Sequence, residues 1–279
     1  MQIFLALFAI TLVAMFKSSA ASRTIAVIGA NGKTGYRAVN YASGKGYNVK
    51  AVTRAGLNFD PMSSKVKSVL GDVTKKNTID AVLKDGVDYV IFAASQSKEG
   101  GTAAEVDKQG LINVCNSCVE NNVKRLVVVS SGAVSKKWSP VFLFLNLFGG
   151  IMTAKFEGEN AIKKICAESN GATSYTIIRP GGLTVEVAVG AKGVELNQGD
   201  EVSGRISRED VAALAVESLD SNDAANTTFE CYNKGTGKKL GEVFLSNLFR
   251  RSDAQPNGTG LERTGDTYAE LFAGLKGGL

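Results

Sequence analysis

Short apolar, β-branched runs alternate with segments of helical periodicity along most of this chain. The runs predict strands at residues 24–28, 47–53, 66–70, 88–93, 124–130 and 174–178. The segments between and after them predict helices at residues 34–43, 77–84, 103–121, 153–169, 208–219 and 266–275. Strands that are nearly continuous in apolar residues and separated by helices are typical of a parallel sheet covered on both faces. The pattern therefore predicts an α/β fold, a Rossmann-like doubly wound parallel sheet.

The pattern becomes less regular after Pro180, where we expect a small C-terminal lobe on the substrate side, beginning at about residue 181. No linker composition divides the chain, so residues 22–279 are interpreted as one Rossmann-like domain. The segment 140–150 (PVFLFLNLFGG) is unusually apolar for a connection. It is either part of the buried core or a lid over a substrate pocket.

The start of the chain has the pattern of a targeting signal. Residues 3–16 are uncharged and mostly apolar, and small residues follow at positions 18–21. This stretch is shorter than the ~20 residues of a spanning helix, so residues 1–21 are interpreted as a signal peptide, with an uncleaved membrane anchor as the alternative. We therefore expect the secretory pathway or the ER lumen, with a plastid as the alternative. Contact with a membrane is expected only through this segment, if it is uncleaved.

The 279-residue chain contains no histidine. That excludes hydrolases built on Ser-His-Asp or Cys-His pairs and every His-ligated metal site, and no metal site is expected. The net charge is +5, but the basic doublets are scattered among acidic residues, so no nucleic-acid partner is expected. Any chemistry must use lysine, tyrosine, serine, cysteine, carboxylates or a bound cofactor.

The chain has four cysteines, too few for a disulfide framework in a chain of this size. Cys115 and Cys118 form a C-x-x-C pair. They share the spacing of one apolar helix stripe with Leu111 and Val119, which favours two small core residues. A redox pair is the alternative.

A glycine-rich turn follows the first predicted strand directly and leads into the first helix. Its residues are Gly29, Ala30, Asn31, Gly32, Lys33, Thr34 and Gly35. In that context, the glycines let the backbone approach a pyrophosphate, whose charge then lies at the helix N-terminus. We expect all of these residues except Ala30 to contact a dinucleotide.

Positive charges near this turn bear on which dinucleotide is bound. Arg54 stands at the end of the second strand, where a carboxylate would hydrogen-bond the ribose 2′-hydroxyl of NAD. A guanidinium there offers a bidentate partner to a 2′-phosphate and favours NADP, and Lys33 can add a second charge. The alternative is that both are ordinary solvated charges.

Residues after the third and fourth strands complete the expected cofactor site. Asp72 and Val73 are placed to meet the adenine edge, whereas Ala93, Ala94 and Ser95 leave a floor of small residues where the cofactor crosses the sheet. Open α/β sheets bind their ligands at these carboxyl ends of the strands.

Further motifs occur in order along the chain: VDKQGLIN (106–113), VVSSG (128–132), KFEGE (155–159), TIIRPGGLT (176–184) and ISREDVA (206–212). Together with the glycine turn they resemble the atypical short-chain dehydrogenase/reductases, specifically the NmrA-like, NAD(P)-binding group that includes plant and algal plastid proteins and flavin/biliverdin reductases. The resemblance extends from residue 24 to about residue 232. It implies NADP(H) binding, ribose contacts by Lys155, a hydrogen bond from Ser130 or Ser131 to a substrate, and Pro180 lining the nicotinamide face.

One position departs from the pattern of these reductases. Where a Tyr-x-x-x-Lys pair would place the phenol that protonates a carbonyl, this chain has Ile151, four residues before Lys155. No tyrosine occurs between Tyr89 and Tyr175. The usual ketone or alcohol mechanism is therefore not expected.

Two functions remain open. The first is an NADP(H)-dependent reductase whose conjugated small-molecule substrate, such as a flavin or quinone, takes its proton from water. The second is a redox-inactive dinucleotide sensor or scaffold whose occupancy changes its affinity for a protein partner, with residues 142–145 as a contact surface. Asp107 and Asn113 are expected to fix the long helix against a neighbouring loop, with substrate contact as the alternative.

Overall fold

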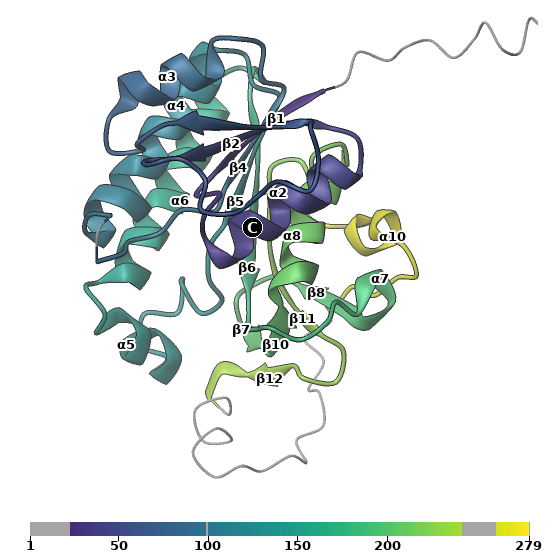
Figure 1. Cartoon of the computed structure of the whole chain (residues 1–279). Helices are drawn as coiled ribbons and strands as arrows, with labels where there is room; N and C mark the ends of the chain where they lie inside the picture. The colour runs from purple at the N-terminus through teal and green to yellow at the C-terminus, as the bar shows by residue number, and fades with distance from the viewer. Residues whose placement is uncertain (1–22, 99, 242–260, 279) are drawn as a thin grey trace, which may run out of the picture.

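The computed structural model describes residues 23–98, 100–241 and 261–278 and confirms the α/β fold. Its centre is an eight-stranded sheet in the order β3-β2-β1-β4-β5-β6-β11-β8, in which every pair is parallel except β11 with β8 (Figure 1). The strands are β1 (Thr24–Ile28), β2 (Asn48–Thr53), β3 (Val66–Leu70), β4 (Tyr89–Phe92), β5 (Arg125–Val129), β6 (Ser174–Pro180), β8 (Val194–Asn197) and β11 (Thr227–Asn233). The six predicted strands are confirmed to within two residues at each end, whereas β8 and β11 were not predicted.

Helices cover both faces of the sheet, as a doubly wound fold requires (Figure 1). On one face lie α2 (Lys33–Gly44) and α8 (Arg208–Glu217), which pack against each other. On the other lie α3 (Lys76–Leu83), α4 (Leu111–Glu120) and α6 (Ile151–Glu168). The order β3-β2-β1-β4-β5-β6 is that of a dinucleotide-binding Rossmann sheet.

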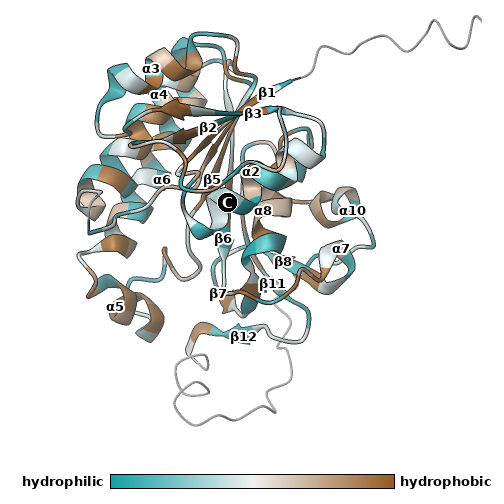
Figure 2. Ribbon diagram, viewed as in Figure 1, coloured by the Kyte–Doolittle hydropathy of each residue, from teal (hydrophilic) through white to brown (hydrophobic). Residues whose placement is uncertain are grey.

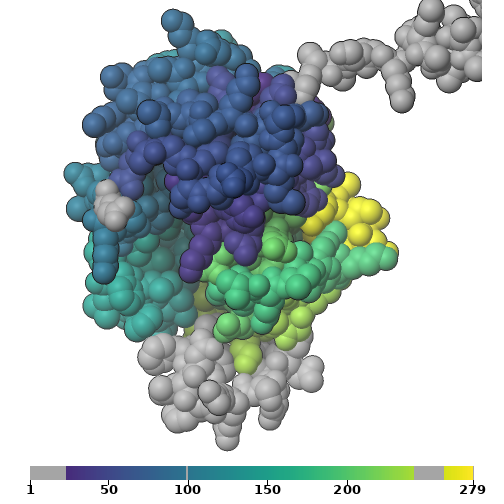
Figure 3. Space-filling view, in the orientation of Figure 1, coloured from purple at the N-terminus to yellow at the C-terminus, as the bar shows by residue number. Residues whose placement is uncertain are grey.

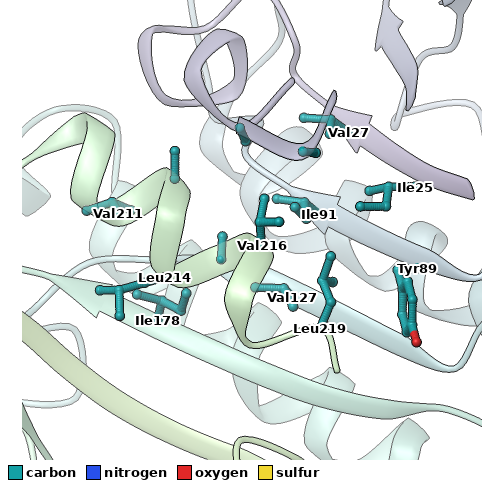
Figure 4. Packing of buried hydrophobic residues seen from close by; sticks show 14 of the residues in the cluster. Ile25, Val27, Tyr89, Ile91, Val127, Ile178, Val211, Leu214, Val216 and Leu219 are labelled. Atoms are coloured by element: carbon teal, nitrogen blue, oxygen red, sulfur yellow. The ribbon is translucent and has the colours of Figure 1, made fainter. Parts of the chain in front are cut away.

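The apolar residues of the strands divide between two buried cores. Ile25 and Val27 of β1 belong to the core under α2 and α8, and Ala26 and Ile28 to the core under α3, α4 and α6. Successive side chains of a strand point to opposite faces, so an uninterrupted apolar run supplies both cores. Figure 2 shows these strands as the hydrophobic centre of the molecule, and Figure 4 shows α8 packing over β4, β5 and β6.

The C-terminal lobe is built onto the main sheet. Its chain supplies β8 and β11 to the sheet edge and forms two small ladders, β7 (Gly182–Thr184) with β10 (Arg205–Ser207) and β9 (Val202–Ser203) with β12 (Lys238–Lys239). Among the described residues of the lobe, two further short helices are α7 (Gly190–Gly193) and α10 (Tyr268–Phe272). The last helix is shorter than expected from the pattern, and Thr267 and Glu270 form a capping box at its start.

Of the apolar segment 140–150, one residue is buried and the others are partly or fully exposed. The segment forms α5 (Pro140–Asn146), whose first turn is capped by the Ser139 side chain. Phe142 is buried, but Phe144, Leu147 and Phe148 are more than half exposed, so the core interpretation is wrong for most of the segment.

No single helix among the described residues is long and apolar enough to cross a membrane; α5 and α6 reach that length and apolarity only as a pair bent by 103°. The predicted signal peptide at residues 1–21 lies outside the described residues. All four cysteines are buried and free. Cys115 and Cys118 lie in the core, as the helix-stripe interpretation expects, and the Sγ of Cys115 lies 3.7 Å from that of Cys166 on α6.

Candidate functional site

The glycine turn packs closely against the neighbouring strands. The backbone N–H groups of Gly29 and Ala30 both donate to the carbonyl of Val52 on β2. Gly29 has φ +83°, and a Cβ there would lie 2.7 Å from the backbone nitrogen of Ala94. A Cβ on Gly35 would lie 2.1 Å from the carbonyl oxygen of Gly29. Gly29 and Gly35 are therefore required for the turn to fold.

Gly32 has a different role, since its φ of −71° suits any residue and its Cβ would meet the Gly29 oxygen at 3.1 Å and the Ala93 oxygen at 3.8 Å. It is the N-cap of α2, and no side chain caps the helix there. No acidic residue lies in the first turn. The open N–H groups and the positive end of the helix dipole therefore face outward, which fits a dinucleotide pyrophosphate.

Asn31 holds the loop that follows β2. Its Nδ2 donates to the carbonyl of Gly56 at 2.8 Å, and its Oδ1 accepts from the backbone N–H of Asn58 at 3.1 Å. Arg54 lies at the end of β2 with its Nη2 3.0 Å from where a Cβ on Gly100 would be. The exposed guanidinium is thus bracketed by the loops after β2 and β4.

The adenine-side residues are held by the loop after β3. The Asp72 carboxylate accepts from the backbone N–H and the hydroxyl of Thr74, and this turn orients the carboxylate. Val73 is buried against Gly110, where a Cβ would lie 2.6 Å from the valine Cγ2. Asn113 donates from Nδ2 to the Val73 carbonyl at 2.9 Å. The expectation that Asn113 fixes the long helix against this loop is confirmed.

The buried carboxylate of Asp107 holds together the loop after β4, the start of the long predicted helix and α6. Its oxygens accept from Ser95 Oγ at 2.7 Å and from the Gln96 backbone N–H at 2.8 Å, and pair with Lys155 Nζ at 2.8 Å. It lies in a π-helical turn, η1 (Ala104–Gly110), that begins the long predicted helix. A Cβ on Gly158 of α6 would come within 2.7 Å of the Asp107 carbonyl oxygen, so α6 packs closely on this turn. The expectation that Asp107 fixes the helix against a loop is confirmed.

The ends of β5 and β6 complete the site. The Gly132 N–H donates to the carbonyl of Pro180 at 2.9 Å, which brings the serine loop next to the end of β6. Ser131 is half-buried, and its hydroxyl donates to the Gly132 carbonyl. Ser130 is buried, and its hydroxyl donates to Glu159 on α6.

A cavity of about 10 Å³ lies between these groups, lined by Lys155, Ser130, Asp107 and Glu159 together with the apolar floor of the sheet. This is room for about one water molecule. Ile151, which stands where the phenol of a Tyr-x-x-x-Lys pair would be, is partly buried against the apolar cluster that includes Val134, Phe142 and Met152.

Residues from the carboxyl ends of six strands are therefore gathered along one edge of the sheet, as sequence reasoning expected. They are Gly29, Asn31, Gly32, Lys33, Thr34 and Gly35 after β1, Arg54 after β2, Asp72 and Val73 after β3, Ala93, Ala94 and Ser95 after β4, Ser131 after β5, and Pro180 at the end of β6. Lys155 joins them from α6. Figure 3 shows the surface hollowed between the N-terminal part and the segment around residues 100–150.

A buried network of charges beneath the serines was not predicted. Arg179 of β6 pairs with Glu159 at 2.6 Å and lies 3.7 Å from Asp200 and 3.8 Å from Glu230. Asp200 in turn accepts from the backbone N–H groups of Ala133 and Ser135. The network therefore ties the serine loop to β6, α6 and the C-terminal lobe. The available sequence signal was a charged residue inside an otherwise apolar strand, Ser174–Pro180 (SYTIIRP).

Three carboxylates around one guanidinium leave excess negative charge. Burial and the nearby Asp200 raise the pKa of Glu230 from 4.5 to about 8, and its Oε1 accepts no hydrogen bond. Because the pKa of Glu230 is higher in the folded state than in the unfolded chain, its protonation stabilises the fold. This contribution is complete below pH 4.5, the pKa of the unfolded chain, and is lost as the pH rises through about 8.

We therefore expect Glu230→Gln to flatten the fall in stability between pH 6 and pH 9. The whole pKa shift corresponds to a loss on the order of 5 kcal/mol, of which roughly 3 kcal/mol falls between pH 6 and pH 9. Denaturant unfolding at both pH values measures this difference. Equal pH dependence in the wild type and in Glu230→Gln would contradict the assignment of this titration to Glu230.

Comparison with known proteins agrees with this geometry. A family model described as NAD(P)H-binding matches residues 29–222. An uncharacterized chloroplastic protein of Arabidopsis thaliana is 34% identical over 211 residues, which cover 71% of this chain and 72% of the relative.

Solved structures share the fold. An oxidoreductase of Lactococcus lactis aligns with a TM-score of 0.65 at 24% identity, over 83% of this chain and 99% of its own. A short-chain dehydrogenase/reductase of Veillonella parvula, solved in complex with NADP, aligns with a TM-score of 0.59 at 17% identity, over 77% of this chain and 96% of its own. Other neighbours with this fold are epimerases. At these identities the structures show the fold alone, whereas the family match covers most of the chain, including the glycine turn and Lys155. The chain belongs to the NAD(P)H-binding family, and its resemblance to the atypical short-chain dehydrogenase/reductases is confirmed.

Proposed function

We propose that this protein is an NADP(H)-dependent reductase that acts on a conjugated small-molecule acceptor without a protein phenol. The observation that carries the proposal is the state of Lys155. Its ammonium group is paired with Asp107, in the site that also contains the glycine turn, where no side chain caps α2. The position of the missing phenol is filled by Ile151. The chain thus retains groups suited to holding a nicotinamide ribose and has none suited to protonating a ketone.

NADP(H), when bound, supplies the hydride. The uncapped start of α2 would hold its pyrophosphate, and Lys155 would donate hydrogen bonds to the ribose hydroxyls. Asp107 positions Lys155 and, through Ser95 and the Gln96 N–H, the loop over which the cofactor would cross the sheet. The half-buried Ser131 hydroxyl would orient the acceptor, and the proton that balances hydride addition to a conjugated ring would come from water.

NADP is proposed over NAD because Arg54 lies at the end of β2, where the 2′-phosphate would be. We expect Arg54→Ala to weaken NADPH binding about 10- to 150-fold, the loss of a charge-assisted contact of roughly 1.5–3 kcal/mol, with NADH affinity little changed. Titration calorimetry measures both, with Arg205→Ala, at the exposed first residue of β10, as the matched control. Equal wild-type affinity for NADPH and NADH would contradict this cofactor preference.

Lys155 and Ile151 test the mechanism together. If Lys155 orients the cofactor, Lys155→Met slows all acceptors by a similar factor, whatever their need for a proton. We expect Ile151→Tyr to add little carbonyl reduction, because Ile151 packs into an apolar cluster with no groups arranged around a phenolate. A panel of quinones, flavins and aldehydes measures both effects. A large gain for aldehydes in Ile151→Tyr would overturn the choice of acceptor.

A redox-inactive sensor remains the second candidate, because α5 and the residues after it expose Phe144, Leu147 and Phe148 where a protein partner can bind. Undetectable turnover of every acceptor, with NADPH still bound, would favour this function over a reductase. A plastid is the proposed location, supported by the chloroplastic relative.

A further inference from the structure

We propose that Cys115 and Cys166 are a reversible oxidation site, at which a hydroperoxide converts two thiols into a disulfide that joins α4 to α6. Their sulfurs lie 3.7 Å apart, although the residues are 51 positions apart in the chain. A disulfide bond is ~2.0 Å long, so the sulfurs need to approach by only about 2 Å. This pair differs from the C-x-x-C pair of the sequence, because Cys118 lies on the same helix as Cys115. The proposed bond joins two helices that only the tertiary fold brings together.

The two helices hold the thiols at the same level. α4 and α6 pack side by side (Figure 1). Gly158 lets them approach closely, since a Cβ there would lie 3.2 Å from Cδ2 of Leu111. Cys115 follows Leu111 by about one turn of α4, and Cys166 follows Gly158 by about two turns of α6. The backbone of the helix pair thus already presents the two sulfurs to each other.

The same helices carry the ion pair of the candidate site near their starts. Asp107 lies in η1, which runs directly into α4, and Lys155 lies in the second turn of α6. Cys115 and Cys166 lie further along the same two helices. The oxidised protein therefore has α4 and α6 held together at two separate points. The bond also closes a long loop of the unfolded chain, so we expect it to stabilise the fold.

Cys166 is the thiol that a small oxidant reaches first. Its side chain is 4% exposed, whereas that of Cys115 is fully buried. It lies in the last turn of α6, and the next two residues, Ala167 and Glu168, are exposed. The last turns of helices open more readily than their centres. A hydrogen bond from Cys115 lowers the pKa of the Cys166 thiol, although burial acts in the opposite direction, and the thiolate is the reactive form.

The chemistry balances with hydrogen peroxide as the oxidant. The Cys166 thiolate attacks the peroxide, the O–O bond breaks, and the sulfur becomes a sulfenic acid while the released hydroxide takes up a proton to form water. The Cys115 sulfur then attacks the Cys166 sulfur, the S–O bond breaks, and hydroxide leaves with the Cys115 proton as a second water. The two thiols lose two electrons and two protons in total, and one peroxide is reduced to two water molecules.

Treatment of the full chain with hydrogen peroxide, followed by peptide mapping without reduction, tests the proposal. We expect one cross-linked species, the disulfide between Cys115 and Cys166, and its return to free thiols with dithiothreitol. The thermal midpoint should rise by about 5–10 °C on oxidation and fall back on reduction. In Cys166→Ala and in Cys115→Ala the disulfide should be absent, and peroxide should leave the midpoint unchanged.

Cys118→Ala is the matched control, since it removes an equally buried thiol from α4 and leaves the proposed pair intact. It should form the same disulfide and show the same shift in midpoint as the wild type. A link between Cys115 and Cys118, a sulfinic acid at Cys166 without a disulfide, or free thiols throughout would overturn the proposal. The readout needs neither NADPH nor an acceptor, so its outcome is independent of the proposed function.

Discussion

Arg179→Met is expected to lower the free energy of unfolding by about 3–5 kcal/mol, the largest effect on stability that we predict. The substitution fills similar volume but leaves Glu159, Asp200 and Glu230 buried without their shared cation. Denaturant unfolding and the thermal midpoint measure the loss, which corresponds to on the order of 10 °C for a domain of this size.

The remaining carboxylates give this prediction a characteristic pH dependence. Without the guanidinium, the pKa of Glu230 rises further, so the deficit of Arg179→Met should shrink as the pH falls and this carboxyl takes up a proton. Arg205→Met, on an exposed position of the same lobe, should change stability by less than about 0.5 kcal/mol. An Arg179→Met protein as stable as the Arg205→Met control would show that the network contributes nothing to the fold.

Gly32→Val is expected to abolish dinucleotide binding, by at least about 100-fold, while the protein stays folded. The backbone of Gly32 suits valine, but the side chain would occupy the space beside the open N–H groups at the start of α2. Titration calorimetry with NADPH measures the loss, and circular dichroism verifies the fold.

Glycines elsewhere in α2 provide the controls. Gly44→Ala, at the other end of the helix, has nothing within 4 Å of its Cβ and should bind NADPH normally. Gly35→Ala should unfold the turn, because its Cβ would collide with the Gly29 oxygen. Normal NADPH binding by folded Gly32→Val would mean that the cofactor lies elsewhere.

The sheet was predictable because its strands are buried on both faces. Continuous apolar runs such as residues 126–129 (LVVV) of β5 need no knowledge of their neighbours to be identified as strands. β11 was missed because its sequence, Thr227–Asn233 (TTFECYN), mixes polar residues with a buried glutamate. Its strand character depends on packing within the sheet that the local pattern does not contain.

In the candidate site, too, one part was predictable from the local sequence and another part was not. The glycine turn was predictable because its chemistry lies within seven consecutive residues. The bond from Asp107 to Lys155 joins residues 48 positions apart on two helices, and only the packing of η1 on α6 brings them together. The Glu159–Arg179 pair is likewise a tertiary contact. Both residues lie in sequence motifs, but nothing in the sequence predicts that they pair.

The isotope effect on the oxidation of NADPH deuterated at the reactive position of its nicotinamide is the most direct test of a phenol-free hydride transfer. The wild-type protein, incubated with this NADPH and flavin mononucleotide or a quinone, should consume the cofactor with a primary isotope effect. Lys155→Met should lower that rate, and Ile151→Tyr should leave it unchanged. The central claim would be contradicted if the protein bound NADPH and the acceptor together but oxidised no NADPH with any member of the panel.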